Sequence, residues 1–66
     1  MEEAEKRYSV SLVYTRNQYK GTEIDLRVLI VYAKNKEEAL GKTIIHYEEI
    51  SKNYKLSNRV IIELKE

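Results

Sequence analysis

His46 is the only histidine in the chain, and its imidazole is the side chain best suited to transfer a proton near neutral pH. No Ser, Cys or Asp stands at a spacing that would complete a recognisable nucleophilic arrangement with it. Two adjacent carboxylate pairs lie in a predicted helix, where neighbouring residues point roughly 100° apart: Glu37-Glu38 and Glu48-Glu49. Neither pair converges on a metal ion or a glycosidic bond, so we predict that the chain is not an enzyme.

Cofactor chemistry finds no support in the sequence either. The chain has no Cys, which excludes disulfides and thiolate zinc sites and leaves only carboxylates to build a metal site. The two glycines, Gly21 and Gly41, are too far apart for a phosphate-binding loop. We therefore expect no cofactor and no metal.

The segment from Arg16 to Lys20 is the most distinctive candidate for partner binding. It combines cations and amides with the aromatic ring of Tyr19. Tyr and Arg are favoured at positions where the binding energy of an interface is concentrated. We predict that Arg16, Tyr19 and Lys20 contact a protein partner.

Nucleic-acid binding is the alternative function for the same segment. A β-ribbon can enter a nucleic-acid groove, and Tyr19 could stack on an unpaired base. Arg27 and Arg59, placed on an uncovered sheet face, would add phosphate contacts. Glu23 and Asp25 lie beside the segment and would repel phosphate, which favours a protein partner.

Two runs of period-two alternation predict the strands that carry this segment, over about residues 7–18 and 22–33. Between them, Tyr19-Lys20-Gly21 fits a three-residue hairpin loop, because Gly adopts the left-handed conformation without steric cost. With Gln18 opposite Thr22, every apolar residue on one face of the first strand meets an apolar partner: Tyr14 opposite Leu26, Leu12 opposite Val28, Val10 opposite Ile30 and Tyr8 opposite Tyr32.

A helix over about residues 36–52 follows the hairpin. Asn35 is a favourable N-cap, and Glu38 three residues later is typical of a capping box. Apolar residues then recur every three or four positions, which gives one buried stripe. A last alternating run predicts a third strand over about residues 56–64.

These elements predict one α+β domain over residues 1–66, of order β-β-α-β, with a three-stranded sheet covered on one face by the helix. Two strand orders remain open. Order 1-2-3 is favoured because the run 28–31 is apolar on both faces, as in a central strand. Order 2-1-3 is fully antiparallel, and antiparallel pairs are commoner overall.

One helix cannot cover both faces of such a sheet. In the predicted register the uncovered face carries aliphatic side chains whose burial is worth roughly 1.5–3 kcal/mol each. A chain of 66 residues is marginally stable alone, so a partner subunit is a natural way to bury them. We therefore predict that this face, with Val13, Leu29, Val31 and Ile61, or the edge of the second strand mediates self-association as a homodimer or binding of another partner.

Charge and composition narrow the functional classes. The net charge is +1, without the basic excess of a dedicated nucleic-acid binder. No apolar run is long enough for a transmembrane helix, and the charged start of the chain is not followed by a signal-peptide core. We expect a cytoplasmic protein that does not bind membranes. Small, cysteine-free, Lys/Glu/Tyr-rich domains are typical of phage or mobile-element accessory proteins, which suggests a regulator or inhibitor.

The stretch Ala33-Lys34-Asn35-Lys36-Glu37-Glu38-Ala39-Leu40 resembles the strand-to-helix junction of HicB-type antitoxins. Those proteins also place a hairpin before a helix that opens with an acidic pair and Ala-Leu. The glycine-rich turn expected between the first strands of that family is missing here. The resemblance implies no function for this chain.

Overall fold

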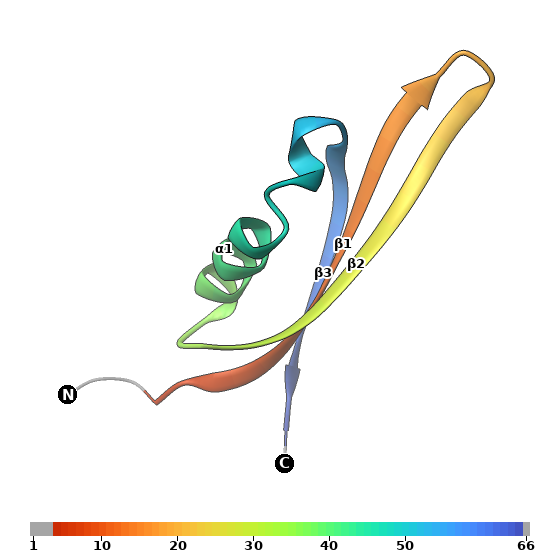
Figure 1. Ribbon diagram of the computed structural model, residues 1–66. Coiled ribbons are helices and arrows are strands. Elements are labelled where there is room, and N and C mark those ends of the chain that lie inside the picture. Colours follow the sequence, from red (N-terminus) through yellow and green to blue (C-terminus); the bar gives the residue numbers. More distant parts are fainter. Residues whose placement is uncertain (1–3, 66) are drawn as a thin grey trace.

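The computed structural model describes residues 4–65, so residues 1–3 and 66 of the predicted domain lie outside the described part. Three strands form one antiparallel sheet in the order β2-β1-β3, and one α-helix packs on one face (Figure 1). This confirms the predicted α+β fold and selects the order 2-1-3. The elements are β1 (Lys6–Gln18), β2 (Gly21–Ala33), α1 (Lys36–His46), the 3-10 helix η1 (Ile50–Lys52) and β3 (Lys55–Leu64).

The β1–β2 hairpin is longer than the helix that covers it. Each of its strands has 13 residues and can span about 44 Å. The helix α1 has 11 residues and spans about 16 Å. The loop end of the hairpin therefore extends past α1, as Figure 1 shows, and the described chain is flat and elongated, with principal extents of 52 × 21 × 12 Å.

The predicted hairpin register is wrong by one residue. Gln18 pairs with Gly21, so the loop has only two residues, and Val10 lies opposite Leu29 instead of Ile30. Gly21 has a φ of +142°, a conformation that favours glycine and lets β2 begin directly after the loop. A shift of one residue transfers every side chain of β2 to the other face of the sheet.

The start of α1 explains why this register is the stable one. Only Lys34 and Asn35 connect β2 to the helix, so the last residue of β2 must lie directly under the chain as it turns. Ala33 fills that position and is fully buried. The register that turns the small Ala33 inward also turns the large Tyr32 outward, where it is 56% exposed.

The core lies between the central strand and α1. Four alternate residues of β1 are almost completely buried, and Ala33 and Ala39 close the same cluster. Side chains from α1, η1 and β3 pack around it, including Ile44, Ile50 and Ile61. The buried residues of β1 are Tyr8, Val10, Leu12 and Tyr14.

The helix is shorter than predicted. It ends at His46, residues 47–49 form a turn, and η1 tightens the chain at Ile50–Lys52. The hydroxyl of Tyr47 donates to the carbonyl oxygen of Val28 at 2.9 Å, which fixes the end of α1 against β2. The tighter turns that follow reverse the chain within a few residues, so that β3 can pair with β1.

The predicted N-cap is confirmed, and its loss has a measurable cost. The Oδ1 of Asn35 accepts a hydrogen bond from the backbone N–H of Glu38 at 2.8 Å. Asn35→Ala leaves this N–H without a protein partner, so we expect the free energy of unfolding to fall by about 1 kcal/mol in urea titrations. Asn53→Ala is the control, because the side chain of Asn53 caps no helix. Equal losses in both variants would contradict the capping role.

Candidate functional site

The face of the sheet turned away from α1 is the largest apolar surface of the described chain. We call it the open face. It combines a row of five residues on β2 with two residues on β3, and each of these side chains is 48–66% exposed. They are Ile24, Leu26, Val28, Ile30 and Tyr32 on β2 and Val60 and Ile62 on β3.

The row of β1 between these two apolar rows has smaller side chains. Ser9, Ser11 and Val13 lie opposite Ile30, Val28 and Leu26 across the β1–β2 pairing. Across this central part of the open face no residue is charged; Arg7, opposite Tyr32, lies at one end. The surface can therefore bury apolar partner groups, but its centre offers no cation to a phosphate.

Only one residue of the predicted self-association face lies on the open face. Val13 does, whereas Leu29 lies opposite the buried Val10, and Val31 and Ile61 pack against the core under α1. The one-residue shift inverts β2 and so accounts for Leu29 and Val31, whereas Ile61 lies on β3 and its pairing opposite the buried Val10 places it on the helix side. The prediction that the sheet has an apolar uncovered face holds, with different residues.

The predicted phosphate contacts are also placed differently. Arg27 lies on the face covered by α1, where its Nε is 2.9 Å from the Oδ1 of Asp25 and its guanidinium carbon is 5.8 Å from the ring centre of Tyr47. Arg59 is exposed, but it pairs with Leu12 and therefore faces the helix side of β3. Neither cation belongs to the open face, so the prediction that Arg27 and Arg59 lie on the uncovered face of the sheet is wrong.

The two residues of the hairpin loop are exposed, as predicted. Tyr19 is 100% exposed, and Lys20 is exposed beside it. They occupy the far end of the hairpin in Figure 1, away from α1. Arg16 differs, because its guanidinium lies 4.7 Å from the ring centre of Tyr54 and is only partly available to a partner.

Glu23 ties the extended hairpin to the segment before β3. Its carboxylate accepts hydrogen bonds from Tyr54, Arg16 and Gln18, the one from Arg16 at 2.9 Å. The bond from the Tyr54 hydroxyl, with that from Arg16, lowers the pKa of Glu23, and the same contact with Glu23 raises the pKa of Tyr54. The hairpin arm is therefore held in place, and the Tyr19-Lys20 loop is presented on a fixed support.

The pKa of Glu23 reports whether its hydrogen bonds with Tyr54 and Arg16 are formed. Because the Tyr54 hydroxyl is the main cause of the lowered pKa, Tyr54→Phe should raise the Glu23 pKa toward its ordinary value. Carbon-detected NMR of the side-chain carboxyl measures this midpoint directly. A group with a lowered folded-state pKa stabilises the fold above its unfolded pKa, and this contribution is lost as the pH falls through the folded value. An unchanged midpoint in Tyr54→Phe would contradict the tie.

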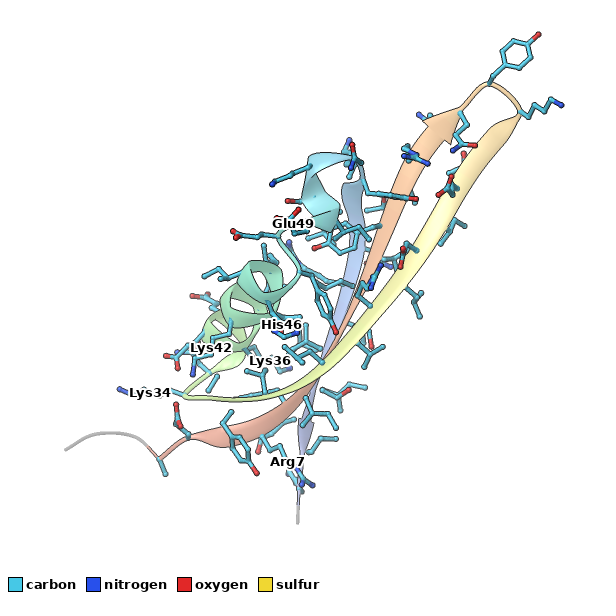
Figure 2. All side chains as sticks on the ribbon, viewed as in Figure 1. Arg7, Lys34, Lys36, Lys42, His46 and Glu49 are labelled. Carbon is cyan, nitrogen blue, oxygen red and sulfur yellow. The ribbon has the colours of Figure 1, made fainter. Side chains whose placement is uncertain are left out.

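The end of the molecule opposite the hairpin loop carries several cations, but among the described residues they do not form a defined binding site. Lys34 and Lys36 lie near the start of α1, and Arg7 lies toward the end of the sheet (Figure 2). Lys42 is engaged by Glu5 at 3.3 Å and Glu38 at 3.4 Å. These pairs lie on the surface, where ion pairs contribute little to the stability of the fold.

His46 and the carboxylates form no catalytic arrangement within residues 4–65. His46 is exposed, and its ring meets only the edge of Tyr47, with 4.7 Å between ring centres. Glu49 pairs with Lys52 at 3.2 Å. Among the described residues no three His, Asp or Glu side chains lie close enough to hold a metal ion.

No helix between residues 4 and 65 has both the length and the apolar character needed to span a membrane.

Comparison with protein-family models, with curated proteins and with solved structures finds no match to this chain. The resemblance of the Ala33–Leu40 junction to HicB-type antitoxins therefore remains confined to that junction.

Proposed function

We propose that this chain is a non-catalytic protein-binding module that works as a homodimer and regulates or inhibits its partner. The observation that carries the proposal is the open face, with seven neighbouring apolar side chains about half to two thirds exposed. Single exposed aliphatic residues are normal on any surface, but a row of five large apolar residues with two more on the same sheet face is typical of an interaction site.

The chemistry of the exposed surfaces favours a protein partner. The centre of the open face is uncharged, so it matches apolar side chains and has no phosphate ligand. The fully exposed Tyr19 and its neighbour Lys20 form a second, smaller surface whose residue types are common in protein interfaces. The two surfaces lie on different parts of the molecule, which allows one to serve self-association and the other a target.

Affinity capture with matched variants tests this function. Tagged wild-type protein is incubated with extract of the native host, and the bound proteins are identified by mass spectrometry. We expect a specific partner that is retained by Ile45→Glu and lost by Leu26→Glu or by Tyr19→Ala/Lys20→Ala. Ile45 is the control because it is an equally large aliphatic residue, 70% exposed, on the helix. Capture that no surface variant changes would contradict the proposal.

A binding measurement with mixed DNA and RNA distinguishes protein binding from the alternative function, nucleic-acid binding. The proposal predicts no binding even at low salt, because Arg27 is paired with Asp25 and Arg59 lies away from the open face. Binding that weakens steeply with added salt would show contacts to several phosphates. That result would replace the protein-binding proposal with nucleic-acid binding.

A further inference from the structure

We infer that the open face is covered by a second copy of this chain, packed face to face, so that two sheets form a sandwich with the helices outside. The inference rests on the proposed function and names the occupant of its main surface. It also assigns the roles of the two surfaces, with the open face used for self-association and the Tyr19-Lys20 loop left free for a target.

The surface area of the chain is the first argument. The chain exposes 5212 Å². A compact monomer of 7.9 kDa would expose about 4400 Å². The excess of about 800 Å² is of the size that each partner buries in an interface of standard size. The open face and the hairpin arm that extends past α1 both contribute to it, and the radius of gyration reflects the same flat, elongated shape, at 13.7 Å against about 11 Å for a compact domain of this length.

The edge of β2 argues against the main alternative, in which two sheets join strand to strand. One side chain of α1 and one of the turn that follows it already occupy this edge. Lys42 donates to the carbonyl oxygen of Tyr32 at 2.8 Å, and Tyr47 donates to that of Val28 at 2.9 Å. Capping of edge carbonyls by other elements is a common way to prevent strand addition.

The second edge of the sheet is irregular. The pairing of β1 with β3 shifts between Val13 and Tyr14, where β3 contains a bulge around Ser57. Bulges at sheet edges also hinder pairing with another chain. Both edges therefore carry a protective feature, whereas the open face carries none.

The open face is suited to its own copy. Its centre is uncharged, so two identical faces meet without repulsion. Large side chains on β2 and β3 flank the smaller Ser9 and Ser11 of β1, which gives each face both projecting and receding rows. Sheets that pack in this way lie about 10 Å apart with their strands roughly aligned.

Sedimentation equilibrium of wild-type and variant protein gives the first test. We expect a wild-type dimer, and we expect Leu26→Glu to raise its dissociation constant about 100-fold or more, because symmetry places two buried charges in each dimer. Ile45→Glu, on the helix, should leave the constant unchanged. A wild-type monomer at high concentration would overturn the inference, and circular dichroism verifies that each variant remains folded.

Single-cysteine cross-linking separates face packing from edge packing. The chain has no Cys, so each introduced thiol is unique. A short bismaleimide should link two copies of Ser11→Cys, at the centre of the open face, and should not link Ser51→Cys on η1. Efficient linking of Thr22→Cys, at the start of the β2 edge, without linking of Ser11→Cys would overturn the face-to-face arrangement.

The two proposals fail in different ways. A monomeric protein whose captured partner is lost in Leu26→Glu would overturn the second copy and the homodimeric state, but it would leave the protein-binding function intact and assign the open face to that partner. A cross-linked dimer whose captured proteins no surface variant affects would support the second copy and contradict the proposed function.

Discussion

Leu12→Ala is expected to remove a large part of the free energy of unfolding of the domain. Leu12 is fully buried at the middle of the central strand and has lost all contact with solvent. Truncation of such a leucine costs about 2–5 kcal/mol, through lost burial and the cavity that remains. A domain of 66 residues has a total stability of only about 3–10 kcal/mol. Urea titration followed by circular dichroism measures the loss.

The matched control for this variant is Ile45→Ala. Ile45 is an aliphatic residue of the same size but is 70% exposed on α1, so its truncation should change stability by no more than about 0.5 kcal/mol. A Leu12→Ala variant as stable as Ile45→Ala would show that β1 does not form the centre of the core.

Tyr14→Phe is expected to make the protein more stable. Tyr14 is 1% exposed, and its hydroxyl has no hydrogen-bond partner among the described residues. Burial also raises the pKa of this phenol, as expected for a group removed from water. A buried hydroxyl without a partner costs about 1–3 kcal/mol, and its removal leaves the ring in place. The melting temperature should rise by roughly 4–8 °C for each kcal/mol gained.

Tyr54→Phe is the matched control, because the Tyr54 hydroxyl donates to Glu23 and its removal breaks that bond. We expect no stabilisation from this second variant. If Tyr14→Phe lowers the melting temperature instead, its hydroxyl must have a partner in solution, such as a bound water molecule.

The strand bounds and the start of the helix could be predicted from the sequence, and the strand order could be reduced to two alternatives. Alternation of apolar residues placed each strand within one residue of its observed start, and Asn35 marked the beginning of the helix. The end of the helix was not predictable in the same way. The apolar stripe continues through Ile50, and the chain turns earlier because Tyr47 is fixed to β2 and β3 must return to pair with β1.

The register could not be predicted because β2 is apolar on both faces. One face has Ile24, Leu26 and Ile30, and the other has Leu29 and Val31, so hydrophobicity alone does not identify the inward side. The more apolar row would be expected in the core of a monomer, but in this structure it faces outward. The loop does not decide between the two registers either, because Gly21 fits both a two-residue and a three-residue connection.

The residues of the candidate site were predicted wrongly because they depend on the register of β2. The existence of an uncovered apolar face was predictable from one helix and three strands, but its residues were exchanged with those of the core. The missing signal is Ala33, because a small residue separated from the helix by only two residues marks where the strand must lie against the turning chain. Residues of the loop were placed correctly, since Tyr19 and Lys20 are exposed in either register.

The central claim is that β2 turns its row from Ile24 to Tyr32 away from α1. Nuclear Overhauser contacts between α-protons test it most directly, because they are strong only between residues that face each other without mutual hydrogen bonds in an antiparallel pair. The carbonyl of Val28 is bonded to Tyr47 and not to β1, so strong contacts are expected for Val28 with Ser11 and Ile30 with Ser9. Strong contacts of Val28 with Leu12 would contradict the register and return the apolar row to the core.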